Sequence, residues 1–528
     1  MKRARAPVAL AVPAVAAVAL VLLPLAYLIL RAGDGGLDAL HVLGRPGTLD
    51  LVGKTALLVG AVTVAAIAIG RSLAWLVTRT DLPARRLIAV LATLPLVIPS
   101  YVAALALLGA LGPRGLLQRL LEGPLGVERL PEIYGFVGAW LALTLSTYPY
   151  VFLLSAAALR GLDPAPEEAA RALGHSGWSV FRRVTLPTLR PSLGAGSLLV
   201  ALYTLSDFGA VSLMQYDALT RSIYLQYRSL FDRTPAAVLA LVLVALTIVL
   251  LVLEERSRRG VRLHRSGSGA DRPAPLVPLR RWRWPALAFC GAVVTAFLLA
   301  PVGVLVYWSA RAVDLGYGIS FAWEAALSSL SVGALAAAAA VLAVLPVAFL
   351  AHRYPSGWTR TIERLAFTGN ALPGIVIALS LVFFAANYAE PLYQTLALLV
   401  FAYVVRFFPQ ALAGVGSALH AVNPRVEEAA RSLGRGPVLV LVTVTVPLIR
   451  RGLLAGGALV FLNAMKELPA TLLLRPIGFE TLATEIWKYT SLSSYSRAAP
   501  PALLLILVSA PVVYLLAARR STDLGAPG

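Results

Sequence analysis

The sequence predicts an all-α, polytopic membrane protein with about 12 transmembrane helices, built as two parallel six-helix repeats. Three observations predict this fold. Of the 528 residues, 59% are hydrophobic and the mean hydropathy is +0.79, which is more apolar surface than a soluble protein can bury. The apolar residues form long runs nearly free of charge, and about 20 such residues span a bilayer as a helix. The second half of the chain also repeats the first.

Twelve stretches are long and apolar enough to be predicted as spans. They are 7–31, 51–77, 87–111, 135–159, 192–214, 236–253, 285–310, 325–351, 365–387, 392–418, 452–474 and 498–518. Lys2, Arg3 and Arg5 precede the first stretch, as in a signal peptide. Its apolar core is too long for a signal peptide and no small-residue cleavage site follows, so we interpret it as a retained span.

Basic residues predict the orientation. With both termini in the cytoplasm, the loops on the inner side hold most of the 46 lysine and arginine residues. The same bias explains the net charge of +20, so we predict contact with membrane lipid and no nucleic-acid partner. The single cysteine, Cys290, excludes a disulfide within the chain and a cysteine-rich zinc site. We predict no cofactor, and the sequence leaves open whether a metal is bound.

The repeat is clearest in two loops. Residues 163–174 read Asp-Pro-Ala-Pro-Glu-Glu-Ala-Ala-Arg-Ala-Leu-Gly, and residues 423–434 read Asn-Pro-Arg-Val-Glu-Glu-Ala-Ala-Arg-Ser-Leu-Gly, at an offset of 260. Earlier in each half the offset is 274, because the first half carries 14 more residues, which we place in the loop at 112–134. Each half has an even number of spans, so both insert with the same orientation. We therefore predict a first half at 1–253, a cytoplasmic linker at 254–284 and a second half at 285–528.

Each repeated loop is predicted to form a helix of about ten residues on the cytoplasmic side. Asp163 and Asn423 are suitable N-caps, and Gly174 and Gly434 suit a left-handed C-terminal cap. The alanine pairs leave a smooth face that another backbone can approach. A single copy could be no more than a solvated surface helix, but two copies at one offset indicate an interaction surface.

These loops resemble the hallmark of permeases of binding-protein-dependent ABC importers, which is Glu-Ala-Ala, a glycine four residues later and a hydrophobic-Pro step. The matching residues are Glu168, Ala169, Ala170, Gly174 and Pro187 in the first half, and Glu428, Ala429, Ala430, Gly434 and Pro447 in the second. The resemblance covers both halves from about residue 50 onward. It implies the type I importer permease fold and two coupling helices that dock into two ABC ATPase subunits. It also implies an external or periplasmic substrate-binding protein as a further partner.

A finer resemblance concerns the cargo. Residues 465–476, with 480–484, resemble the second half of iron(III) transport permeases, and Asp207-Phe-Gly209 resembles their first half. The fused layout is shared by that group, and also by thiamine permeases and some phosphonate permeases. The resemblance therefore implies iron(III) as cargo, with thiamine and phosphonate as alternatives.

The chain is predicted to be a transport subunit and not an enzyme. Gly53-Lys54-Thr55 is similar to the end of a phosphate-binding loop, but the motif needs a glycine where Thr48 stands. ATP hydrolysis is therefore expected in partner subunits. A twelve-span secondary transporter is a competing interpretation, but it has no reason to duplicate a docking helix. A membrane scaffold without transport is a third, and co-purification with an ATPase distinguishes the first interpretation from both.

Two acidic residues, Asp207 and Glu467, lie deep within predicted spans at the repeat offset of 260. A carboxylate facing lipid is costly, so both are expected to face the interior or water, on a path for a cation. The structural alternative is that Asp207 caps a helix break before Gly209, while Lys466 or Arg406 neutralises Glu467. The sequence favours neither role.

Overall fold

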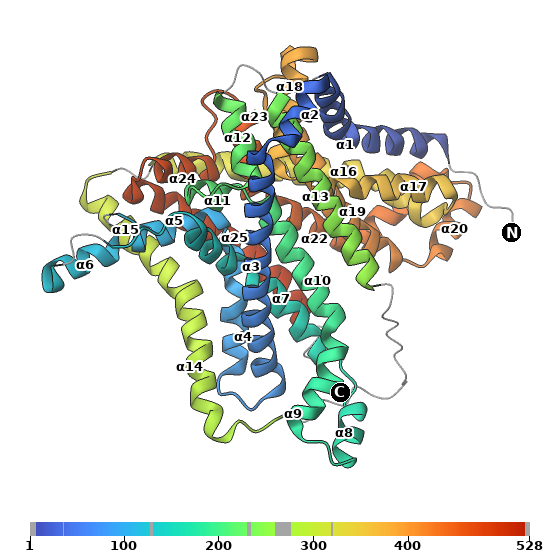
Figure 1. The fold of residues 1–528 in the computed structure, drawn as a ribbon. Coiled ribbons are helices and arrows are strands. Elements are labelled where there is room, and N and C mark those ends of the chain that lie inside the picture. Colours follow the sequence, from blue (N-terminus) through green and yellow to red (C-terminus); the bar gives the residue numbers. More distant parts are fainter. Residues whose placement is uncertain are drawn as a thin grey trace. The chain divides into compact units, whose positions relative to one another are not determined.

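The structure, a computed structural model, describes residues 7–34, 36–113, 115–126, 130–229, 234–258, 276–317 and 320–522. Within these ranges the regular structure is helical, apart from one isolated β-bridge between Thr80 and Val277 (Figure 1). The predicted all-α class is therefore confirmed. Most of the predicted linker at 254–284 lies outside the described residues, and so do both chain ends.

The chain forms two compact units. Unit 1 comprises Met1–Thr48, Ser222–Val244 and Leu315–Gly528, and unit 2 comprises Leu49–Arg221 and Ala245–Asp314. These units do not coincide with the two halves of the repeat, because each unit includes segments from both halves. The division at 1–253 and 285–528 thus remains a prediction about the repeat and does not describe the packing.

The helices of unit 1 come mainly from the second half of the chain. They are α1 (Val8–Asp34), α2 (Gly36–Gly44), α12 (Leu219–Ser229), the first part of α13 (Thr234–Arg258), α16 (Ser320–Arg353), α17 (Gly357–Ala366), η5 (Phe367–Ala371), α18 (Gly374–Tyr388), η6 (Glu390–Leu392), α19 (Leu396–His420), α20 (Pro424–Ser432), α21 (Pro437–Val440), η7 (Leu441–Thr445), α22 (Val446–Met465), α23 (Pro469–Leu474), α24 (Leu482–Ser491) and α25 (Tyr495–Thr522).

The helices of unit 2 come mainly from the first half. They are α3 (Pro46–Arg79), α4 (Arg85–Thr93), η1 (Leu94–Val97), α5 (Ser100–Leu111), α6 (Leu116–Leu125), α7 (Phe136–Arg160), α8 (Ala165–Ala172), α9 (Gly177–Val180), η2 (Phe181–Thr185), α10 (Leu186–Ser206), α11 (Gly209–Leu213), η3 (Arg280–Trp282), α14 (Arg283–Val294), η4 (Thr295–Leu299) and α15 (Ala300–Asp314).

The first helix of each half packs against the body of the other half. In unit 1, α1 lies against α16 and α18, and the buried Ser380 hydroxyl donates to the Pro24 carbonyl at 2.9 Å. In unit 2, α15 lies against α5, and the Trp308 indole N–H donates to the Gly109 carbonyl, also at 2.9 Å. The apolar faces of the two first helices are therefore buried by chain segments distant in sequence.

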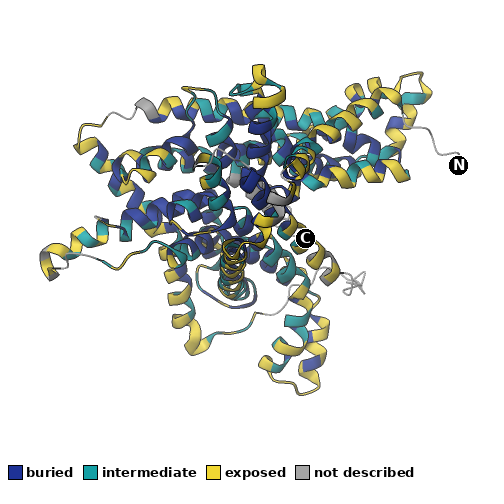
Figure 2. Cartoon of the chain, turned by 45° about the horizontal axis from the view of Figure 1, so that its top comes forward, coloured by how far each residue is buried: buried dark blue, intermediate teal, exposed yellow. Residues whose placement is uncertain are grey.

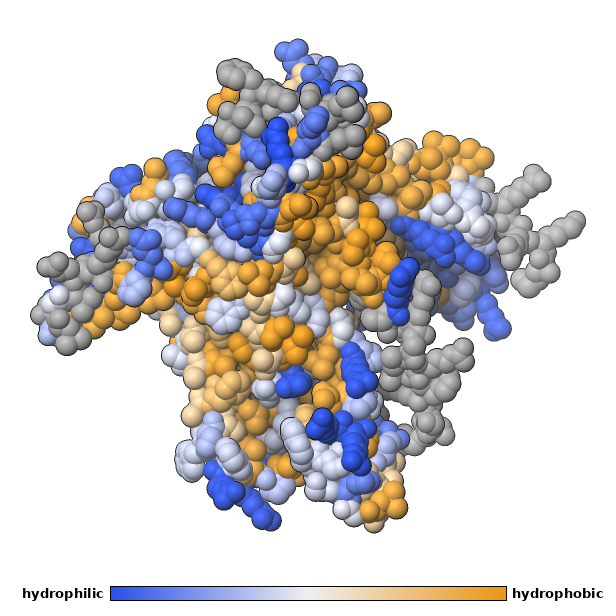
Figure 3. Space-filling view, in the orientation of Figure 1, coloured by the Kyte–Doolittle hydropathy of each residue, from blue (hydrophilic) through white to orange (hydrophobic). Residues whose placement is uncertain are grey.

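Each unit has one central helix. In unit 2, α7 packs against α5 and α10, and in unit 1, α19 packs against α16 and α22. These two helices begin and end at the repeat offset of 260. Buried residues concentrate on such inner helices, while exposed residues follow the outward faces of the long ones (Figure 2). Apolar side chains cover much of those outward faces, as expected for a surface against lipid (Figure 3).

Ten helices among the described residues are long and apolar enough to cross a membrane, and the bent pair Gly357–Ala371 and Gly374–Tyr388 makes an eleventh. Prolines explain why some of the twelve predicted spans are not single helices. The bent pair breaks by 101° at Pro373, and the predicted span 87–111 divides between η1 and α5 at Pro99. Proline lacks the N–H that continues a helix. The predicted span 192–214 falls on α10 and α11 and is not among the eleven.

Candidate functional site

The two repeated loops fold as the sequence predicts, into α8 and α20. Asn423 is the N-cap of α20, and its side chain accepts from the Arg425 N–H at 3.1 Å. In the first half the N-cap is Pro164, one residue after the predicted Asp163, which still accepts from the Ala165 N–H at 3.0 Å. The helices have eight and nine residues, close to the predicted length.

Both helices end at a glycine in the left-handed region, as predicted. The φ angles are 87° at Gly174 and 85° at Gly434, values that side-chain-bearing residues rarely adopt. After each glycine the chain makes a short helical turn and a π-helical turn, η2 or η7, before the long helix that follows. Pro187 and Pro447 lie in the first turn of α10 and α22, directly after the π-helical turns.

The adjacent glutamates of each loop point in opposite directions. Glu167 and Glu427 are buried, with 4% and 1% of their surface exposed, whereas Glu168 and Glu428 are exposed. The motif in the sequence pointed to the second glutamate of each pair, Glu168 and Glu428, and not to the first. The signal that could have found the first is that arginine and threonine recur at matched positions in both halves.

In unit 2, Glu167 lies at the centre of a cluster that we call the first junction. It forms an ion pair with the buried Arg79, the last residue of α3. The Thr185 hydroxyl, at the end of η2, donates to its other oxygen at 2.8 Å. Arg171, one turn later on α8, lies 3.7 Å from the carboxylate. Glu167 thus connects α3, α8 and the start of α10.

The second junction, in unit 1, repeats these four residue types. Glu427 pairs with Arg353, the last residue of α16, at 2.9 Å. The Thr445 hydroxyl donates to Glu427 at 3.1 Å, and Arg431 lies 3.8 Å away. The arginines that begin the two clusters match at offset 274 and the other residues at offset 260. The cluster is therefore part of the repeat.

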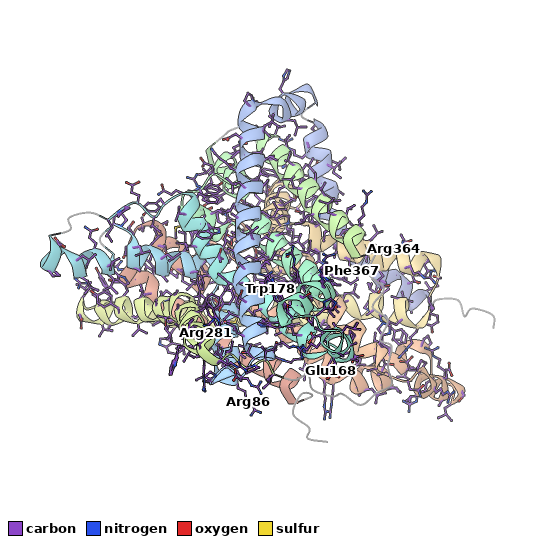
Figure 4. The ribbon with its side chains drawn as sticks, turned by 60° about the horizontal axis from the view of Figure 1, so that its bottom comes forward. Arg86, Glu168, Trp178, Arg281, Arg364 and Phe367 are labelled. Carbon is purple, nitrogen blue, oxygen red and sulfur yellow. The ribbon has the colours of Figure 1, made fainter. Side chains whose placement is uncertain are left out.

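The outward faces of the two loops are acidic and apolar. Besides the two outer glutamates, Leu173 and Leu433 are 81% and 83% exposed at matched positions just before the glycines. Trp178 on α9 is also exposed, and Figure 4 labels it together with Glu168. Exposed apolar side chains that gather on one face mark a protein–protein or membrane contact surface.

The alanines of the motif are not equally accessible. Ala169 and Ala429 are exposed, Ala170 is buried and Ala430 is partly buried. Only Ala169 and Ala429 therefore lie on the outer face of each helix, where a small side chain leaves room for another backbone to approach.

Asp207 caps a helix break, as the structural alternative predicted. α10 ends at Ser206, and the Asp207 carboxylate accepts from the backbone N–H groups of Ala210 and Val211 at 2.9 and 3.3 Å. The Ser100 hydroxyl, at the start of α5, donates to the other carboxylate oxygen. Asp207 is buried, so its charge is stabilised by hydrogen bonds within unit 2.

Glu467 occupies the matching break in unit 1, but its partner is different. Arg406 on α19 lies 2.9 Å from the buried Glu467 carboxylate. Gly374 lies against the pair, and a Cβ there would require the Glu467 carboxylate to shift. Of the two cations that the sequence offered as partners, Arg406 forms the ion pair with Glu467. Asp207 belongs to unit 2 and Glu467 to unit 1.

Gly53-Lys54-Thr55 does not form a phosphate-binding loop. All three residues lie inside α3, where Lys54 pairs with Asp50 one turn earlier at 2.7 Å. The Thr55 hydroxyl donates to the Leu51 carbonyl at 2.7 Å. Across the part of the chain that the structure describes, no three His, Cys, Asp or Glu side chains gather as metal ligands.

Residues 66–263 and 340–519 match the family described as the binding-protein-dependent transport system inner membrane component. The chain belongs to this family. Each matched stretch contains one of the two junctions and one of the two helix breaks. The protein is therefore a fused permease, the multi-pass membrane component of an ABC importer. The interpretations as a secondary transporter and as a scaffold are wrong.

Named relatives extend over most of the permease. It is 36% identical over 500 residues to the Fe(3+)-transport system permease protein FbpB 2 of Haemophilus influenzae, across 94% of this chain and 95% of the relative. It is 24% identical over 457 residues to the ferric transport system permease protein FbpB of Actinobacillus pleuropneumoniae. The sulfate transport system permease protein CysW of Escherichia coli is 32% identical, over only 37% of this chain.

Proposed function

We propose that this permease imports ferric iron, delivered by an external or periplasmic binding protein. One observation carries the proposal, which is the 36% identity to a ferric permease along nearly the full length of both chains. The sulfate permease matches only 37% of this chain. The cargo named for the full-length relative therefore supports ferric iron as the substrate of this permease over thiamine or phosphonate.

The duplicated loops support docking of two ATPase subunits, one on α8 and one on α20. Glu168 and Glu428 would face basic side chains of the ATPases, while Leu173 and Leu433 would enter apolar grooves. ATP binding would close the two ATPases and draw the loops with them, so that the permease alternates between inward-open and outward-open forms. This role requires both loops to lie in the cytoplasm, and we propose the same side for both chain ends.

The test is complementation and reconstitution. A strain lacking the gene is expected to grow poorly on limiting iron and to recover when the gene returns with its ATPase and binding protein. In proteoliposomes, radiolabelled ferric ion on the binding protein should accumulate only with ATP. If the purified permease binds no ATPase, the importer mechanism is wrong. If the strain instead requires thiamine or phosphonate, the importer mechanism stands but the assignment of iron is wrong.

A further inference from the structure

We infer that Glu167 and Glu427 are positioning residues which make the ends of the transmembrane helices move with the docking helices. The inference rests on the proposed function, because it assumes that α8 and α20 are the parts moved by the ATPases. The four-residue junctions carry it, since each is buried and each occurs in both halves.

The docking helices have little other attachment to the membrane helices. In unit 2, α8 packs mainly against α9 and η2, the segments that follow it in the chain. The same holds in unit 1 for α20, which packs mainly against α21 and η7. A short helix held only by its neighbours in sequence can tilt without moving anything else. A side-chain link to a distant helix is therefore needed to transmit a push.

The Glu167–Arg79 ion pair supplies that link. It joins α8 to the last residue of α3, 88 residues earlier in the chain. The Thr185 hydroxyl bonds the same carboxylate to the π-helical turn that leads into α10. A buried ion pair resists separation, since either charge alone would be left in a site without water. The ends of α3 and α10 are thus held to the docking helix as one body.

The outer glutamates face away from the junctions, so the two adjacent glutamates of each helix have different roles. Glu168 and Glu428 are exposed and available to a partner, whereas Glu167 and Glu427 have no surface to offer one. Loss of an outer glutamate should therefore weaken ATPase docking. Loss of an inner glutamate should leave ATPase docking intact and uncouple ATP hydrolysis from transport.

The experiment compares three quantities in the reconstituted transporter, which are bound ATPase, ATP hydrolysed and ferric ion transported per ATP. For Glu167→Gln with Glu427→Gln we expect normal ATPase binding and a fall of about tenfold in transport per ATP. Thr185→Val with Thr445→Val should lower it about twofold to threefold. The matched controls, Thr188→Val and Arg86→Gln, alter exposed residues and should not change the ratio.

A charge swap separates positioning from mere stability. Arg79→Glu with Glu167→Arg recreates the pair in reverse and should recover part of the coupling that either single change removes. If the glutamine variants do not fold, the threonine pair and the swap still decide the matter. Unchanged transport per ATP in the threonine pair, with no recovery in the swap, overturns the inference. Failure of the unmodified protein to bind an ATPase would instead refute the proposed function.

A second measurement does not depend on the cargo. Spin labels at Ala172→Cys on α8 and Leu87→Cys on α4, the helix that follows α3, report whether α8 moves together with the segment that continues from α3. Both positions are exposed, while the native Cys290 is buried. We expect the label distance to stay the same with and without ATP in the unmodified background, and to change on ATP binding in Glu167→Gln. A distance that behaves identically in both backgrounds contradicts the link.

Discussion

The junctions and the helix breaks are both duplicated, but only the junctions keep the same side-chain partners in both copies. At the junctions, arginine, glutamate, threonine and a second arginine recur at matched positions with the same contacts. At the breaks, each carboxylate accepts from the backbone N–H three residues later, but Asp207 also accepts from the Ser100 hydroxyl, whereas Glu467 forms an ion pair with Arg406.

The difference follows from what each region is proposed to contact. Two ATPase subunits of one kind would make the same contacts with α8 and α20, so the same four residues would suit both loops. A cation passing Asp207 and Glu467 would be attracted by either carboxylate, so the proposed path does not require the same partner at both breaks. Even within the junctions, the guanidinium of Arg353 also donates to the carbonyls of Leu419 and Val422, at 3.3 and 3.2 Å.

The largest effect is expected from charge reversal at the exposed glutamates of α8 and α20, Glu168 and Glu428. For Glu168→Lys with Glu428→Lys, we expect uptake to fall by roughly 100-fold or more, because two attractive contacts become repulsive. The measurement is uptake at matched membrane abundance, with co-purified ATPase as a second readout. Normal uptake by normally inserted protein would mean that these glutamates are only solvated.

The second prediction sharpens the contrast between the two breaks. Arg406→Met leaves Glu467 buried without its cation, which should destabilise the fold by about 3–5 kcal/mol. Ser100→Ala removes one hydrogen bond from Asp207 and should cost about 1.5–3 kcal/mol, since the backbone donors remain. Thermal unfolding of both variants in detergent checks the order. Equal losses would show that the two breaks are held equally strongly despite their different partners.

The third prediction asks whether the breaks also serve the cargo. Asn and Gln keep a carbonyl oxygen that can accept the same backbone hydrogen bonds, so Asp207→Asn with Glu467→Gln should preserve the breaks. We expect uptake to fall about tenfold, which corresponds to roughly 1.4 kcal/mol of lost attraction for a passing cation. The assay measures uptake and substrate-stimulated ATPase activity, with basal ATPase activity as control. Unchanged uptake would refute the path role, and loss of folded protein would leave these residues a structural role alone.

The smallest effect is expected at another place where the halves differ. Glu485 in α24 is buried, whereas the corresponding helix of the first half, α12, carries no acidic residue. Burial raises the pKa of the Glu485 carboxyl, and Lys488 at 3.4 Å opposes the shift. Because the folded state holds the proton more tightly than the unfolded state, stability falls as pH rises through the raised pKa.

Glu485→Gln removes that titration. We expect the variant to melt about 1–2 °C higher than the parent at neutral pH, with no advantage in acid, below the ordinary pKa of a glutamate. Melting curves of both proteins across this pH range test the sign. An advantage that grows toward acidic pH would contradict the prediction.

Several features could be predicted from the sequence because they depend on local chemistry. Long apolar runs predicted the spans, and matched caps and glycines predicted α8 and α20 within one or two residues. The repeat offset also paired Asp207 with Glu467 correctly. The prolines are visible in the sequence, but how far each one breaks a span depends on which neighbours satisfy the freed backbone groups. The predicted number of twelve membrane spans was therefore not fully reproduced.

The sequence by itself determined a duplicated helical permease with a short helix at matched positions in each half, since periodicity, caps and repeats are properties of short segments. Only the tertiary structure decided which glutamate of each pair turns inward. Glu167 and Glu168 are the same residue type on one short helix, and the choice depends on Arg79, which is brought to α8 by packing from another part of the chain. Packing likewise decided that the first helix of each half lies in the unit formed mainly by the other half. An apolar helix face does not specify which apolar surface covers it.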